Sequence, residues 1–133
     1  MKTFESKLIV IAKSKQEIFR FLSDFRNFEK LMPKEVSKWS AQEGSCSFTI
    51  SNMAELNMKF GDCVEFSNIN IISSGRNPFN YNLKLNIIEI DSNSSQFSAI
   101  FEADLNPMIA MMASRPLTNF VDTLGDKLQE VLS

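Results

Sequence analysis

Apolar and polar residues alternate through most of the middle of this chain. Cys46, Phe48 and Ile50 alternate with serine and threonine, and a period of two also runs through residues 54–60 and 79–87. Successive side chains of a strand point to opposite faces, so this pattern predicts strands with one buried and one wet face. We predict six such strands between about residues 34 and 105. Their connections are too short for crossovers, which favours antiparallel pairing.

One irregularity is predicted inside this sheet. The alternation that runs from residue 54 to Phe66 would turn Asp62 toward the buried face. A glycine in a strand often marks a β-bulge, in which one extra residue shifts the register. Gly61 therefore predicts a bulge that returns Asp62 to solvent.

The beginning of the chain predicts a strand followed by two short helices. Residues 4–13 alternate and then become continuously apolar, as in a covered strand. Ser14 and Glu17 have the spacing of a capping box, in which the Ser14 hydroxyl accepts the Glu17 amide proton and the carboxylate reciprocates. Asp24 is predicted to cap a second short helix, which Pro33 ends.

The end of the chain predicts one long amphipathic helix over residues 106–132. Asn106 is a good N-cap and Pro107 suits the first helical position. Apolar residues then recur at spacings of three and four from Leu117 onward, which indicates a buried stripe. Pro116 predicts a kink or break near residues 113–115.

Composition narrows the class of protein. The 133 residues suit one domain spanning residues 1–133, and the net charge is −2, from 14 basic and 16 acidic residues. No basic stripe is present, so nucleic acid is not an expected partner. No apolar run approaches the roughly 20 residues that span a bilayer, so we expect a cytoplasmic protein without stable membrane insertion.

The inventory of reactive side chains is sparse. Cys46 and Cys63 lack the spacing of a metal or disulfide motif and are predicted to be free thiols. Histidine is absent, which removes Ser-His and Cys-His catalysis and histidine-ligated metals. We predict no metal or cofactor, and an enzyme is not favoured.

Two local runs carry a resemblance to a known superfamily. The run IAKSKQEIF at residues 11–19, with LSDF at residues 22–25, resembles the opening of the polyketide cyclase/dehydrase and coenzyme Q-binding branch of the START-like, or SRPBCC, superfamily. The dipeptide Pro78-Phe79 and the run LNPM at residues 105–108 resemble short bacterial members. Asn52 and Met53 stand where plant pathogenesis-related allergens carry a glycine-rich loop.

The resemblance covers essentially the whole chain and implies an α+β helix-grip fold. Its order is β-α-α-β6-α, with a curved antiparallel sheet of seven strands wrapped around the long C-terminal helix. Such a fold implies a ligand cavity between the sheet and that helix. The inward-facing candidates to bind the ligand are Phe48, Met58, Phe60, Phe79, Tyr81, Leu83, Phe101, Met108, Met111, Met112 and Phe120.

These candidates leave alternatives open. The apolar residues either line a pocket or simply fill a close-packed core. The Tyr81 hydroxyl either bonds to the backbone or orients a ligand. Arg76 and Arg115 are candidates for the cavity mouth, where they could bind a carboxylate, or they are solvated surface residues.

Three functions follow from this reasoning. The first is binding of a small hydrophobic or lipid-like molecule in the cavity. The second is a polyketide cyclase/dehydrase-type enzyme, which requires a buried ionisable group in the cavity. The third is a protein-interaction module associated with a ribosome or chaperone, which an exposed apolar patch would favour.

Overall fold

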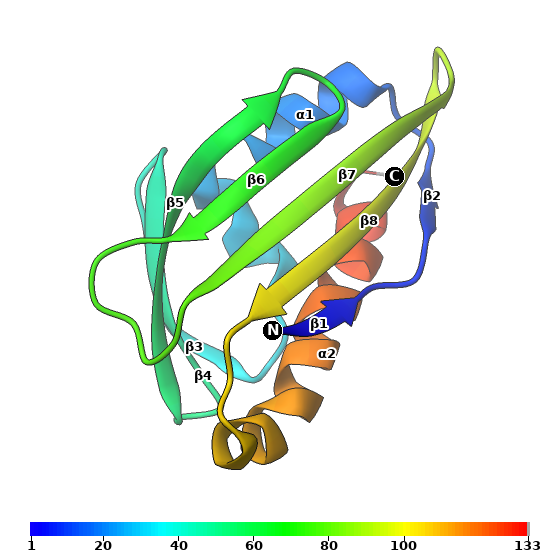
Figure 1. The fold of residues 1–133 in the computed structure, drawn as a ribbon. Helices are drawn as coiled ribbons and strands as arrows, with labels where there is room; N and C mark the ends of the chain where they lie inside the picture. Colours follow the sequence, from blue (N-terminus) through cyan, green and yellow to red (C-terminus); the bar gives the residue numbers. More distant parts are fainter. Residues whose placement is uncertain (133) are drawn as a thin grey trace.

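The computed structural model describes residues 1–132, which form one antiparallel sheet and three helical segments. The elements are β1 (Lys2–Glu5), β2 (Ile9–Ile11), α1 (Lys15–Leu22), the 3-10 helix η1 (Phe25–Leu31), β3 (Val36–Ala41), β4 (Ser45–Ile50), β5 (Ala54–Val64), β6 (Asn68–Ser73), β7 (Tyr81–Asp91), β8 (Ser94–Ala103) and α2 (Pro107–Leu132). The strand order is β1-β8-β7-β6-β5-β4-β3, and β2 also pairs with β8. Figure 1 shows α1 and α2 on the same face of the curved sheet. The predicted helix-grip architecture is therefore confirmed.

The first strand is divided into two pieces. Phe4 pairs with Phe101 and Ile9 pairs with Phe97, so five steps along the first strand match four along β8. Ser6 takes up the extra residue, because its amide donates to the Ala99 carbonyl and its hydroxyl accepts the Ala99 amide, both at 2.8 Å. The shift is needed because Phe4 and Ile9 have opposite parity, yet both side chains are buried. The sheet consequently has eight strands where seven were predicted.

The bulge predicted at Gly61 is confirmed. Phe60 pairs with Ile71 and Cys63 pairs with Ile69, so the register shifts between these two positions. A Cβ atom on Gly61 would lie 3.1 Å from the Ile72 Cγ2 atom. Glycine therefore permits a close strand approach here, and Asp62 is exposed.

The helix caps lie where the sequence predicted them, with one difference. The Ser14 hydroxyl accepts a hydrogen bond from the Glu17 amide at 3.2 Å, as predicted. The Glu17 carboxylate, however, accepts its hydrogen bond from the same hydroxyl at 3.3 Å and not from the Ser14 amide. Asp24 Oδ1 accepts the Arg26 amide at 2.9 Å and begins η1, while Asn106 Oδ1 accepts the Ile109 amide at 2.9 Å and begins α2.

Of the kink or break predicted near residues 113–115, the break is wrong, because helix α2 continues through Pro116. Proline has no amide proton to donate to the carbonyl of Met112, four residues earlier. Met112 is exposed, so water can reach this end of the helix turn. A proline on this face therefore leaves the helix uninterrupted.

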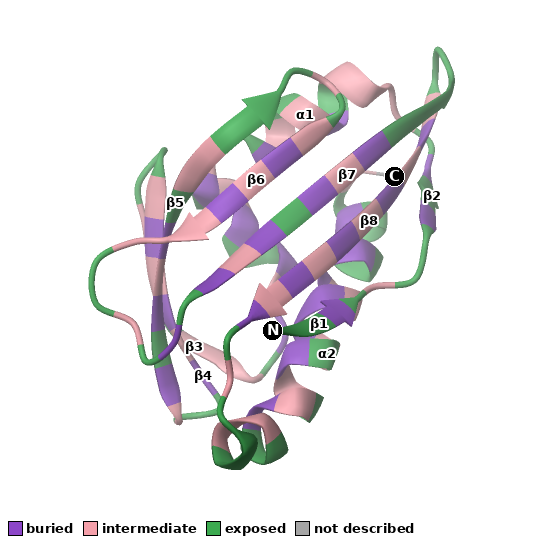
Figure 2. Ribbon diagram, in the orientation of Figure 1, coloured by how far each residue is buried: buried purple, intermediate pink, exposed green. Residues whose placement is uncertain are grey.

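The core lies between the inner face of the sheet and α2. Figure 2 shows buried residues alternating with less buried ones along β7 and β8. The α2 stripe supplies Leu117, Phe120, Val121, Leu124 and Leu128, all of which are buried. A Cβ atom on Gly125 would lie only 3.0 Å from the Ile9 Cγ1 atom, so α2 approaches β2 closely at this position.

Candidate functional site

Six aromatic rings form a continuous row between the sheet and α2, which we name the aromatic file. Successive ring centroids are 5.2 to 6.1 Å apart. Edge-to-face and stacked rings at such separations attract one another beyond the area they bury. In order along the file, the residues are Phe79, Tyr81, Phe101, Phe120, Phe48 and Trp39.

Strand register brings these rings together. Tyr81 pairs with Ala103 and Leu83 pairs with Phe101, so Tyr81 and Phe101 are diagonal neighbours on the inner face. Diagonal positions on one face are within reach of aromatic side chains. Phe120 projects from the buried stripe of α2 and lies between Phe101 and Phe48, at 6.1 and 5.8 Å.

The aromatic file is a packed row of side chains. Phe48, Phe101 and Phe120 are each exposed by 2% or less, and each contacts two other rings of the file. Met58 and Leu83, also candidates, are buried in the same core. Side chains therefore fill the interior at this level, as the core alternative describes.

The Tyr81 hydroxyl bonds to the backbone. It donates to the Asn57 carbonyl at 2.7 Å and lies 3.1 Å from Asn77 Oδ1. Asn57 also holds the β6–β7 loop directly, because its amide donates to Asn77 Oδ1 and its side-chain amide donates to the Arg76 carbonyl, both at 2.8 Å. Tyr81 thus belongs to a network that anchors this loop to β5.

Two titratable side chains are buried among residues 1–132, and both are neutral near pH 7. Burial raises the pKa of Tyr81 above its usual value, and burial raises the pKa of the Cys46 thiol to about 12. In the same part of the chain, no group of three or more Cys, Asp or Glu residues could hold a metal ion. The cyclase alternative requires an ionisable group that exchanges protons near neutral pH, and neither side chain supplies one.

An open pocket of about 490 Å³ lies at the Phe79 end of the file. The β6–β7 loop lines it with residues 77–80, the segment leading into α2 lines it with residues 104–106, and α2 itself contributes Ile109. Phe79 is 9% exposed and is thus accessible from this pocket. We call this feature the Phe79 pocket.

The three methionine candidates do not face inward, and this part of the prediction is wrong. Met108, Met111 and Met112 are 72%, 87% and 57% exposed. The buried stripe of α2 extends toward the N-terminus from Leu117 at spacings of three and four residues, through Ala113 to Ala110 and Ile109. The methionines are off this spacing and therefore lie on the opposite side of the helix. Extending the stripe in this way was the sequence signal that could have placed them correctly.

Phe60 and the two arginine candidates also lie away from the file. Phe60 is half-buried and stacks on Phe25, with ring centroids 4.2 Å apart. Arg76 and Arg115 are exposed, and neither lines the Phe79 pocket. Arg76 nevertheless lines an adjoining pocket of about 460 Å³ that shares Asn77 and Pro78 with the Phe79 pocket.

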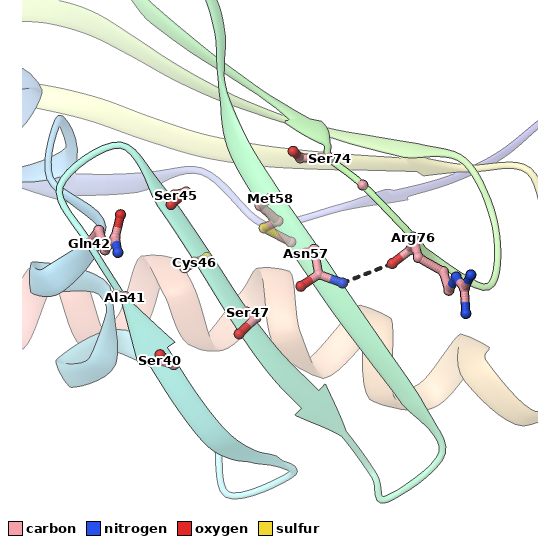
Figure 3. A pocket seen from close by; sticks show the side chains of 11 residues that line it. Ser40, Ala41, Gln42, Ser45, Cys46, Ser47, Asn57, Met58, Ser74 and Arg76 are labelled. Carbon is pink, nitrogen blue, oxygen red and sulfur yellow. Dashed lines mark hydrogen bonds between the residues drawn. The ribbon is translucent and has the colours of Figure 1, made fainter.

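Each arginine lies beside a different surface pocket. Arg76 borders a pocket of about 560 Å³ that is rich in serine, and Figure 3 shows its guanidinium directed away from Ser47. Arg115 borders an open groove of about 730 Å³ together with Lys34 and Glu35.

Trp39 was missed as a site residue. The register of β3 shifts between Ser37 and Ser40, and Lys38 has a positive φ of 55°. This irregularity resets the alternation of inward and outward positions in β3. Counting by twos along the sequence therefore could not place Trp39 beside Phe48, where the ring centroids are 5.5 Å apart.

Comparisons with known proteins identify the fold. No family model and no curated protein matches the chain. A START superfamily protein from Mycobacterium smegmatis superposes with a TM-score of 0.70 at 15% identity, covering 98% of this chain and 96% of that one. The protein TTHA0849 from Thermus thermophilus gives 0.77 at 13% identity, with coverages of 98% and 97%.

A plant enzyme shares the same architecture. A Thalictrum norcoclaurine synthase, whose structure holds a transition-state analogue, gives a TM-score of 0.71 at 13% identity, covering 98% of this chain and 93% of that one. At these identities the likeness establishes the fold and not the activity. The chain has a START-like fold, as the resemblance of residues 11–25 implied.

Proposed function

We propose that this chain binds a small hydrophobic or lipid-like molecule, which enters from the Phe79 pocket and inserts its apolar part between the rings of the aromatic file. The observation that carries the proposal is the continuity of the file. It begins at Phe79, a residue that lines an open pocket, and continues between the sheet and α2 as far as Trp39. The START-like fold, which is a ligand-binding fold, supports the same reading.

Binding in this site requires aromatic side chains to move apart. Phe79 moves first, because it is the most exposed member of the file after Trp39 and contacts Tyr81 alone among the rings. An apolar ligand compensates for the lost ring contacts with its own contacts and gains about 25 cal/mol for each Å² of its surface removed from water.

The single tryptophan allows a direct test. Trp39 lies at the far end of the file, so a ligand among the rings should change its fluorescence. We expect saturable binding of the uncharged dye N-phenyl-1-naphthylamine, at one dye per chain, with quenching of Trp39 by energy transfer. Native mass spectrometry of the same mixture should give the same stoichiometry.

Variants inside and outside the file distinguish binding at this site from nonspecific binding of the dye. Phe120→Leu changes a ring of the file, whereas Phe28→Leu changes an equally buried ring in η1 that contacts Phe25 instead. We expect the first variant to alter the dye affinity and the second to leave it unchanged. Equal effects, or dye binding without a change in Trp39 emission, would contradict the proposal.

A second candidate function is docking of a protein partner on the methionine face. The exposure of Met108, Met111 and Met112 favours it, because exposed methionines form adaptable apolar surfaces. Met111→Glu should then abolish co-purification of a defined partner while dye binding in the file persists. A partner retained by Met111→Glu would locate the interface elsewhere.

A further inference from the structure

We infer that the ligand of the aromatic file is uncharged. This inference rests on the proposed function and specifies the chemical class of the molecule bound. It follows from the side chains that a ligand would meet along its whole path, first in the Phe79 pocket and then among the rings.

The file offers no partner for an ionised group. Five of its members are phenylalanine or tryptophan, and the sixth, Tyr81, already donates its hydroxyl proton to the Asn57 carbonyl. The neighbouring Cys46 is a neutral thiol that is 6% exposed. A charge buried without a partner carries a desolvation penalty of several kcal/mol, which these groups do not offset.

The pocket at the end of the file also selects against anions. Asp104 is the only charged side chain that lines it within residues 1–132, and Asp104 is exposed. Arg76 and Arg115, the cations that could have paired with a ligand carboxylate, do not line this pocket, although Arg76 lines an adjoining pocket that shares Asn77 and Pro78 with it. An anionic head group therefore meets a carboxylate here and no guanidinium.

A cationic head group is disfavoured for a different reason. Ring faces and Asp104 both attract cations, but an exposed cation–π contact is weak. That gain is smaller than the penalty of withdrawing an ammonium group from water into the file. Neutral ligands are thus preferred over ligands of either charge.

Matched probes test this inference. We would measure displacement of N-phenyl-1-naphthylamine by 1-octanol, octanoate and octylammonium, which each contain eight carbons in an unbranched chain and differ in head-group charge. We expect 1-octanol to bind at least about a hundredfold more tightly than either ion, because neither ion finds a partner for its charge along the file. The dye itself should bind more tightly than 1-anilinonaphthalene-8-sulfonate, which adds a sulfonate to the same skeleton.

The possible outcomes are distinct. Octanoate binding as tightly as 1-octanol, with loss on Arg76→Ala, would show that an arginine does reach the head group. Octylammonium binding as tightly, with loss on Asp104→Asn, would show that Asp104 and the rings accept a cation. Either result overturns the inference that the ligand is uncharged but leaves the proposed function standing. Failure of the dye and all three probes to bind overturns the proposed function and the inference with it.

Discussion

At the scale of single residues, Tyr81 combines an apolar position in the aromatic file with a structural hydrogen bond. Its ring stacks on Phe101 at 5.2 Å, while its hydroxyl donates to the Asn57 carbonyl at 2.7 Å. The Asn57 carbonyl also accepts the Ser74 amide at 2.9 Å, so the β6–β7 loop has more than one attachment to β5. The hydroxyl therefore serves loop anchoring and is not available to orient a ligand.

Replacing this residue separates the two roles. Tyr81→Phe should lower the free energy of unfolding by about 0.5 to 1.5 kcal/mol, because one hydrogen bond is lost while the ring remains. Urea denaturation measures this change, and the affinity for N-phenyl-1-naphthylamine should stay within about twofold, since less than 0.5 kcal/mol is involved. A large loss of dye affinity at unchanged stability would instead assign the hydroxyl to the ligand.

The two cysteines should differ sharply in thiol reactivity. Cys46 is buried, and its pKa of about 12 leaves almost no thiolate at pH 8, whereas Cys63 is exposed on β5. In a titration with Ellman's reagent, we expect one thiol per chain to react quickly and the second only after unfolding. The Cys63→Ser variant should lose the fast phase, and loss of that phase in Cys46→Ser would contradict this assignment.

At the scale of elements, the contact between α2 and β2 depends on a glycine. A methyl group on Gly125 would meet the Ile9 Cγ1 atom at 3.0 Å, and Ile9 belongs to a strand that cannot easily withdraw. Gly125→Ala should therefore destabilise the protein by about 1 to 3 kcal/mol through overpacking. Gly44→Ala is the control, because no atom lies within 4 Å of its Cβ position.

The two ends of α2 should respond differently to truncation of a side chain. Leu124 is fully buried, so Leu124→Ala should cost about 2 to 5 kcal/mol of stability in thermal or urea unfolding. Met111 is 87% exposed, so Met111→Ala should change stability by less than about 0.5 kcal/mol. Equal losses of stability in the two variants would contradict this placement of the side chains.

Much of the element order could be predicted because local signals agree with one another. Capping residues, periodicity and the parity conflict at Asp62 depend on neighbouring residues alone, and they located the helices, most strands and the Gly61 bulge. The division of the first strand was also encoded, in the opposite parity of Phe4 and Ile9, but only the pairing with β8 shows where the extra residue lies.

The candidate site was less predictable, since it is assembled from β3, β4, β7, β8, α2 and the β6–β7 loop, which supplies Phe79. Five of its six rings were among the predicted residues. The alternation of β7 extends back to Phe79, and the other four follow from regular strands and the helical stripe. Trp39 depends on the irregular backbone at Lys38. The packing of the rings against one another depends on tertiary distances, which periodicity does not contain.

At the scale of the whole molecule, ligand binding should couple to unfolding. A probe that binds the folded chain alone raises the free energy of unfolding, by about 2.7 kcal/mol at one hundred times its dissociation constant. We therefore expect 1-octanol at that excess to raise the melting temperature, measured by calorimetry. A lowered melting temperature would mean that the alcohol prefers the unfolded chain, contrary to a specific site.

The irregular strands at the two borders of the sheet have a consequence for self-association. A long, regular border strand offers evenly spaced backbone donors and acceptors onto which another chain can add. Here Ser6 interrupts one border, where the Gln129 side chain also donates to the Val10 carbonyl at 2.7 Å, and the shift between Ser37 and Ser40 interrupts the other. Neither border presents a uniform template, so growth of the sheet from molecule to molecule is discouraged at both ends.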